Sequence, residues 1–218
     1  MSQIMHVDRK CSVCGTENHY VVLRSTNALG APDLDLRPSE SKRSTMPLWI
    51  QTCSQCGYVS FSIEDNTKVN EEFLKSEEYC SCSNIDFKSD LARKFYKFYL
   101  INIFDKNCAV AFYAALYAAW ACDDAKDKEN AVFCRKLAIE ENEKIIEGYY
   151  DELVTEARET LMVQKADLLR RAGLFEKLIN EYSALEFDDT DLRKFITFEI
   201  EKAKEQDTAC YTLGDVNG

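Results

Sequence analysis

The chain has 218 residues, 46% of them hydrophobic, and only seven glycines and three prolines. This length allows one large domain, or one small and one medium domain, and the composition argues against long disordered stretches. No apolar run is long enough to cross a bilayer, and the first residues lack the apolar segment of a secretory signal. We therefore expect a cytoplasmic protein without membrane contact.

Charge is distributed unevenly along the chain, whose formal net charge is −11. Residues 1–69 contain as many Lys and Arg as Asp and Glu, so residues 70–218 carry the whole negative excess. This difference predicts two regions with different surfaces. The acidic larger region disfavours binding along a phosphate backbone, which needs clustered cations.

Residues 1–69 are predicted to form a small β region. Polar, turn-prone residues 26–47 contain all three prolines, and we interpret them as an ordered loop. Three other runs are rich in β-branched and aromatic residues and are bounded by turn formers, which is typical of short strands. These runs are 19–25, 48–53 and 58–63.

Two Cys-x-x-Cys-Gly motifs carry the chemistry of this region. They pair Cys11 with Cys14 and Cys53 with Cys56. A Cys-x-x-Cys turn followed by glycine forms a tight knuckle, and two knuckles supply the four thiolates of a tetrahedral zinc site. We therefore predict one zinc ion bound by these four residues. Four thiolates leave no open position for water, so the ion is expected to be structural and not catalytic.

Other interpretations of these residues stay open. Iron also accepts four thiolates, one pair alone is compatible with a redox motif, and the pairs could be unrelated turns. His6 or His19 could replace a cysteine, although with four cysteines available we interpret both as surface or packing residues. Cys80 and Cys82 form a C-x-C pair with no matching pair nearby, and the sequence assigns them no role.

After about residue 70, the apolar spacing becomes helical and glycine and proline nearly vanish. The segment 106–122 is apolar on most sides and is expected to be the most buried helix. Trp120 is interpreted as a core residue before a solvated acidic turn. Asp188 or Asp189 is the candidate N-cap of the last helix, and residues 207–218 are predicted to be a flexible tail. The predicted helices are 70–78, 87–103, 106–122, 128–148, 152–172, 174–185 and 189–206.

A partial repeat signal surrounds Gly173. Ala166, Leu169, Gly173 and Tyr182 fall where a tetratricopeptide repeat places small, large, turn and packing residues. Leu178 stands where that repeat usually has a small residue, so another kind of helix-pair packing stays open.

Several blocks of sequence share a further likeness. They are CSVCG (11–15), GAPDLDLRP (30–38) with RST (43–45), WIQTCSQCGYVSF (49–61) and AALYAAWACDDA (114–125). Together they resemble a bacterial domain-of-unknown-function family, whose members have a zinc-ribbon-like N-terminal region with two CxxC motifs followed by tetratricopeptide-like helices. Many members have proline after the third cysteine, where this chain has Ser54. The resemblance implies the same two-part architecture and no established activity.

Asp33, Asp35 and Arg37 are the remaining candidate binding residues. They alternate with leucines, and alternation in an extended segment puts them on one side, where they could form a small recognition surface. We favour a structural role, in which the leucines pack on the β region and the charges cap turns. As a third option, Arg37 or Arg43 could donate hydrogen bonds to zinc-bound thiolates.

The sequence thus predicts a mainly α fold. A zinc-ribbon-like β region at 1–69 precedes a tetratricopeptide-like helical domain at 70–206. For function we favour a non-catalytic interaction module, with the ribbon as a rigid platform and the helices as a groove for an unknown protein or peptide. A nucleic-acid-binding zinc ribbon is the alternative, because Arg9, Lys10, Arg24 and the 37–43 stretch could form a basic face. A carboxylate-based enzyme is a third reading, although no H-E-x-x-H motif or phosphate-binding glycine loop is present.

Overall fold

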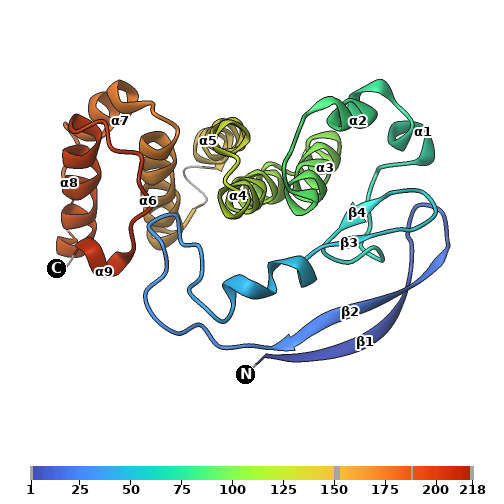
Figure 1. The fold of residues 1–218 in the computed structure, drawn as a ribbon. Helices are drawn as coiled ribbons and strands as arrows, with labels where there is room; N and C mark the ends of the chain where they lie inside the picture. Colours follow the sequence, from blue (N-terminus) through green and yellow to red (C-terminus); the bar gives the residue numbers. More distant parts are fainter. Residues whose placement is uncertain (1, 150–152, 188, 217–218) are drawn as a thin grey trace.

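The computed structural model describes residues 2–149, 153–187 and 189–216. A small β part precedes a row of helices, so the predicted fold class, mainly α with a small N-terminal β region, is confirmed. Figure 1 shows the β part along the lower edge and the helices above it, from α1 (Glu71–Leu74) at one end to α8 (Thr190–Lys204) at the other. Among the described helices, none has the length and apolar character needed to cross a membrane.

The β part consists of two separate antiparallel hairpins. Strands β1 (Gln3–Lys10) and β2 (Glu17–Ser25) form the longer one. Strands β3 (Gln51–Thr52) and β4 (Val59–Ser60) form a much shorter one. Each hairpin turn contains one Cys-x-x-Cys motif.

This part differs from the expectation in two ways. The sequence does not predict β1, because most of its residues are exposed and its polar residues hide the strand signal. The strands predicted over 48–53 and 58–63 are only two residues long each. Before the first of them, a 3-10 helix, η1 (Arg43–Leu48), contains Pro47 and takes up the residues preceding β3.

The helices follow the predicted segments closely. The predicted helix 70–78 is divided in two, because Asn70 and Ser76 each accept a backbone hydrogen bond as an N-cap. Asp189 caps α8, whereas Asp188 and residue 152 lie outside the described residues. The other helices are α2 (Glu77–Cys80), α3 (Asp90–Asp105), α4 (Cys108–Asp124), α5 (Lys128–Tyr149), α6 (Thr155–Arg171), α7 (Phe175–Tyr182) and α9 (Leu213–Val216).

Helix α4 lies between α3 and α5 and packs on both. Its contact faces are rich in alanine, and these small side chains let the neighbouring helices approach closely. Five alanines of α4 are fully buried: Ala111, Ala114, Ala115, Ala118 and Ala119.

Residues 207–216, predicted as part of a flexible tail, have specific partners. The backbone N–H of Leu34 donates to the carbonyl of Tyr211 at 2.9 Å, and the N–H of Leu213 donates to the carbonyl of Pro32 at 3.0 Å. The chain end therefore lies against the N-terminal loop, a contact between distant segments that no local pattern signals. The last two residues lie outside the described part of the chain. The domain division at residue 69 stays a prediction.

Candidate metal centre and binding groove

The two hairpin turns meet and bring together the four cysteines of the predicted metal site. All four Sγ atoms lie within 4.8 Å of one another. Between the motifs, Cys11 Sγ is 3.7 Å from Cys56 Sγ, and Cys14 Sγ is 3.6 Å from Cys53 Sγ. A tetrahedron with Zn–S bonds of about 2.3 Å has S···S edges of about 3.8 Å. The cluster could therefore hold one metal ion.

The two turns share one backbone conformation. In each, the N–H of the first cysteine donates to the carbonyl five residues later, which is Thr16 at 2.9 Å and Tyr58 at 2.8 Å. The N–H groups of Gly15 and Gly57 donate back to the first cysteine of their own motif, at 2.9 and 3.0 Å. Both glycines have positive φ, +75° and +73°. Glycine adopts this conformation without the steric cost that a Cβ atom brings, so the shape of the knuckle explains the glycine in each motif.

The four thiols have different surroundings. Cys11 and Cys53 are buried, whereas Cys14 and Cys56 are partly exposed. A hydrogen bond with Thr16 lowers the pKa of Cys14 to about 6. Burial raises the pKa of Cys11 and of Cys56. A bound cation would replace the protons of these thiols, and a set of four sulfur donors suits a soft or borderline metal.

Hydrogen bonds fix the second knuckle to β2 and to α2. Asn18 Oδ1 accepts from the backbone N–H of Ser54 at 2.9 Å, and Asn18 Nδ2 lies 3.6 Å from Cys53 Sγ. The Tyr79 hydroxyl donates to the carbonyl of Gly57 at 2.9 Å. Proline at position 54 could not donate to Asn18, so the serine adds a contact beside the cluster.

Asp33, Asp35 and Arg37 lie inside the protein and not at an exposed recognition surface. Their exposed fractions are 3%, 0% and 4%. The segment turns here instead of running extended: the N–H of Leu36 donates to the carbonyl of Asp33 at 2.9 Å, and Leu36 has a φ of +65°. The expected alternation is therefore absent. Leu34 is fully buried, whereas Leu36 is partly exposed.

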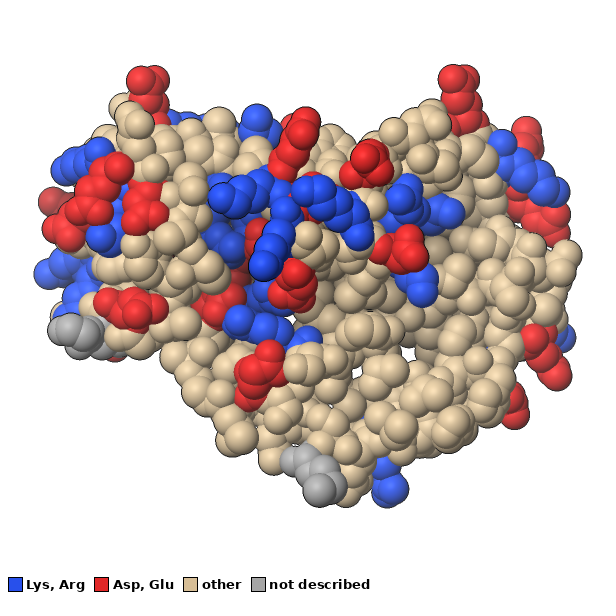
Figure 2. Space-filling view, viewed as in Figure 1, with Lys and Arg blue, Asp and Glu red and all other residues tan. Residues whose placement is uncertain are grey.

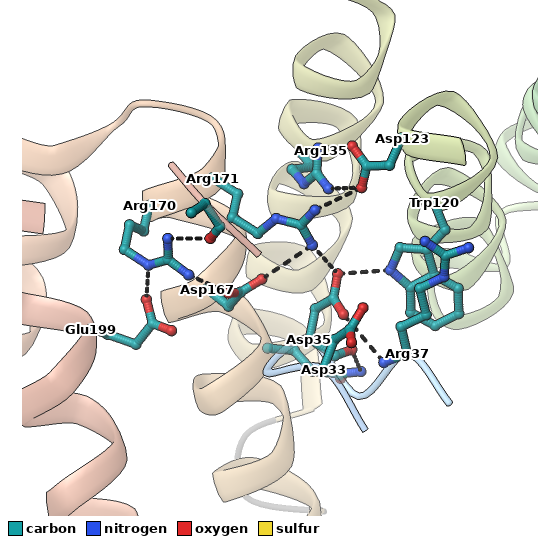
Figure 3. Close-up of polar contacts among 12 residues, drawn as sticks. Asp33, Asp35, Arg37, Trp120, Asp123, Arg135, Asp167, Arg170, Arg171 and Glu199 are labelled. Carbon is teal, nitrogen blue, oxygen red and sulfur yellow. Dashed lines mark hydrogen bonds and ion pairs between the residues drawn. The ribbon is translucent and has the colours of Figure 1, made fainter. Parts of the chain in front are cut away.

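Asp35 connects the N-terminal loop to a buried ion network (Figure 3). Its Oδ2 accepts hydrogen bonds from Trp120 Nε1 at 2.7 Å and from Arg171 at 3.0 Å. Arg171 also donates to Asp123 at 2.7 Å, and Asp123 accepts from Arg135. The loop is thereby tied to α4, α5 and α6. Asp123, expected in a solvated turn, is instead paired with two arginines.

Arg170 extends this network to α8. Its guanidinium donates to Glu199 at 2.6 Å and to Asp167 at 2.8 Å. Burial raises the pKa of Glu199 to about 8 and that of Asp167 to about 6. Glu199 Oε1 has no hydrogen-bond partner among the described residues. The connected network has one carboxylate more than it has guanidinium groups: Asp35, Asp123, Asp167 and Glu199 face Arg135, Arg170 and Arg171.

An aromatic groove lies where the loop, the β part, α4 and α6 meet. It encloses about 480 Å³. The Tyr117 ring lies 4.9 Å from Trp120 and 5.4 Å from Trp49 between ring centroids. Phe61 and Tyr113 are each 38% exposed, so a ligand can reach them. The groove is lined by Leu36, Pro38, Lys42, Trp49, Phe61, Tyr113, Tyr117, Trp120 and Gln164.

No pattern in the sequence signals this groove as a whole. Its aromatic residues come from residues 49–61 and from α4, which are far apart in the chain, so no local spacing signals their proximity. The available signal was the pair Tyr113 and Tyr117 in the predicted helix 106–122, because two tyrosines one turn apart interrupt an otherwise small and apolar helix.

A second cavity, of about 550 Å³, bears on the expectation of a carboxylate-based site. Asp123, Arg135 and Arg171 line it, and Asp123 is paired with both arginines. The two carboxylates with raised pKa, Asp167 and Glu199, are 1% and 0% exposed and are not among the lining residues. The groups with the pKa of a general acid are therefore shut away from this cavity.

Half of the cations expected to form a nucleic-acid face have carboxylate partners. Figure 2 shows Lys and Arg spread over the helices and interleaved with Asp and Glu. Within the N-terminal part, three arginines have carboxylate partners: Arg9 pairs with Glu64, Arg37 with Asp124 and Arg43 with Asp33. Pairing of this kind lowers the positive potential that nucleic-acid binding needs. It also gives Arg37 and Arg43 partners other than the cysteine thiolates.

No family model, curated protein or solved structure matches this chain. Fold and site therefore define the protein as a mainly helical one whose small β part has a four-cysteine cluster that could hold a metal ion. The resemblance to a bacterial family of unknown function stays a prediction.

Proposed function

We propose that the protein is a non-catalytic interaction module, stabilised by one structural zinc ion, that binds a protein or peptide segment in the aromatic groove. The observation that carries the proposal is the groove itself. It places five aromatic side chains around one concave site, and aromatic side chains dominate the energetics of protein–protein contacts.

Zinc is the metal that best suits the cysteine cluster. The S···S distances of 3.6 and 3.7 Å between motifs are close to those of a tetrahedral zinc–thiolate site. Four sulfur ligands close the coordination sphere, which is typical of structural zinc. The ion would fix the two hairpins to each other, and the second hairpin contributes Phe61 to the groove just after β4.

The ion network supports a preformed groove. Asp35, bound to Trp120 and Arg171, holds the loop whose next residues, Leu36 and Pro38, line the groove. A rigid site loses less entropy on binding than a flexible one, so this anchoring favours affinity. Lys42 is the charged residue among those that line the groove, and it favours a partner with an acidic group near its apolar contact.

A random-peptide phage library tests the proposal, with the zinc-loaded protein as bait. We expect enriched peptides with aromatic, proline or aliphatic residues. Tyr113→Ala should weaken their binding about tenfold or more, because it removes an exposed ring from the groove. Tyr149→Ala is the matched control, because Tyr149 is an exposed tyrosine on α5 outside the groove. No enrichment, or equal loss in both variants, would contradict the proposal.

A further inference from the structure

The two histidines of this chain lie side by side on the longer hairpin. In the β1–β2 pairing, Asp8 is directly opposite His19, and His6 is two pairs further along, opposite Val21. Residues opposite each other in an antiparallel pair point to the same face, so all three side chains share one face. The other face contacts the second knuckle, through Asn18 and Tyr20.

Two contacts define the arrangement of the imidazoles. His19 Nδ1 lies 2.8 Å from Asp8 Oδ1, and since a carboxylate only accepts, the Nδ1–H donates. This fixes the tautomer of His19 and leaves a lone pair on its Nε2. His6 Nδ1 lies 3.0 Å from that Nε2. A carboxylate bound to the far nitrogen of an imidazole is the usual support of a metal-binding histidine.

The separation of the two nitrogens suits neighbouring ligands of one ion. With metal–nitrogen bonds of about 2.0–2.1 Å, two ligands are about 3.3 Å apart in a tetrahedron and about 2.9 Å apart at adjacent corners of a square. The observed 3.0 Å lies between these values. The side chains of His19 and Asp8 are 60% and 82% exposed, and His6 is exposed, so water can complete the coordination.

We propose that His6 Nδ1 and His19 Nε2 form a second, exchangeable site for a divalent transition-metal ion, distinct from the cysteine cluster, with Asp8 as the positioning residue. Two imidazoles and water suit Cu²⁺, Ni²⁺ and Zn²⁺, with affinity highest for Cu²⁺. The negative charge of Asp8 and of the whole chain attracts such a cation.

Metal binding at this site moves one proton between the two nitrogens of His6 and releases none. Without metal, His6 Nδ1–H donates to His19 Nε2. When the metal binds, His6 Nδ1 becomes a ligand, and the proton of His6 moves through water to the Nε2 of the same ring. His19 keeps its proton on Nδ1, where Asp8 accepts it throughout.

Isothermal titration with Ni²⁺ tests this site, using untagged protein whose cysteine cluster has been loaded with zinc. We expect one equivalent of Ni²⁺ that is lost in His6→Ala and in His19→Ala. Asp8→Asn should weaken binding about tenfold or more while keeping the stoichiometry, because it removes the charge that orients His19. Glu17→Gln, on the same face of β2, is the control and should bind like the unchanged protein.

The exposed thiols Cys80 and Cys210 are present in every variant, so any nickel that they take cancels in the comparison. Circular dichroism checks that each variant is folded, and His6→Gln replaces His6→Ala if the latter is not. In NMR spectra, Ni²⁺ should broaden the imidazole signals of both histidines first. Equal nickel stoichiometry in the unchanged protein and the histidine variants, or broadening elsewhere first, would overturn the proposal.

Discussion

Individual buried carboxylates hold the N-terminal loop against the helices. Asp35 is fully buried and receives one hydrogen bond from α4 and one from α6. Asp123 and Glu199 lie in the same network, but their surroundings shift their pKa in opposite directions. These two residues therefore predict opposite dependences of stability on pH.

Asp123→Asn should make the protein less sensitive to acid. Burial alone would raise the pKa of Asp123, but Arg135 and Arg171 outweigh it and lower the pKa. Because the pKa of Asp123 is lower in the folded protein than in the unfolded chain, ionised Asp123 stabilises the protein at pH values above 3.8. This stabilisation is lost as the pH falls through the folded-state pKa. Urea unfolding over a pH series should show lower stability of the variant near neutrality, by about 1–3 kcal/mol, and a shallower loss in acid. Asp191→Asn, at an exposed position, should behave like the unchanged protein.

Glu199→Gln should remove a loss of stability that occurs as the pH rises from 4.5 to about 8. Burial raises the folded-state pKa of Glu199 from 4.5 to about 8. The stability that protonated Glu199 contributes is fully present below pH 4.5 and is lost as the pH rises through about 8. The contribution of Glu199 to the free energy of unfolding of the unchanged protein should therefore fall as the pH rises from 4.5 to about 8 and stay constant above that. Glutamine stays neutral, so the same decline in the variant would contradict a protonated Glu199.

At the scale of elements, the two knuckles and the long helices follow from local sequence. Asn70, Ser76 and Asp189 start helices because their side chains accept backbone hydrogen bonds. Apolar periodicity predicted the other helices, because each buries at least one face. Strand β1 escaped prediction because its first four residues are all exposed, so half of the strand has no alternating burial. The contacts of 207–216 depend on the distant loop and have no local signal.

Glycine should be required in the knuckle turn but not within a helix, and one substitution at each place tests this difference. Gly57→Ala should cost about 1–2 kcal/mol, because φ is +73° there and a Cβ meets no atom within 4 Å, so the cost is backbone strain alone. Gly148→Ala should stabilise the protein by about 0.5–1 kcal/mol, because Gly148 lies in α5 with open space beside it. Thermal unfolding of the zinc-loaded variants measures both. Equal effects of the two substitutions would contradict a special turn at the knuckle.

At the scale of the whole molecule, one part of the site could be predicted and the other could not. The four-cysteine cluster could be predicted because two short motifs contain both the cysteines and the glycines that shape the turns. The groove and the ion network join residues of the loop to α4, α5, α6 and α8, so they exist only after folding. The buried positions of Asp33, Asp35 and Arg37 were equally hidden, because charged residues are ordinarily expected at the surface.

Removal of the metal should loosen the two hairpins of the N-terminal part. The hairpin turns contact each other through the four sulfur atoms, and the short β3–β4 hairpin is too small to be stable alone. Chelation should therefore lower the melting temperature and increase hydrogen exchange in residues 51–60 more than in α4. An unchanged exchange pattern after complete removal of the metal would contradict a structural role.

X-ray absorption spectroscopy of the zinc-loaded protein tests the central claim most directly. With His6→Ala and His19→Ala combined, the chain contains no imidazole, so only the cysteine cluster is observed. A closed structural site would give one zinc per chain with four sulfur neighbours at about 2.3 Å. Fewer than four sulfurs, or oxygen ligands from water in the first shell, would contradict a closed structural site made by Cys11, Cys14, Cys53 and Cys56.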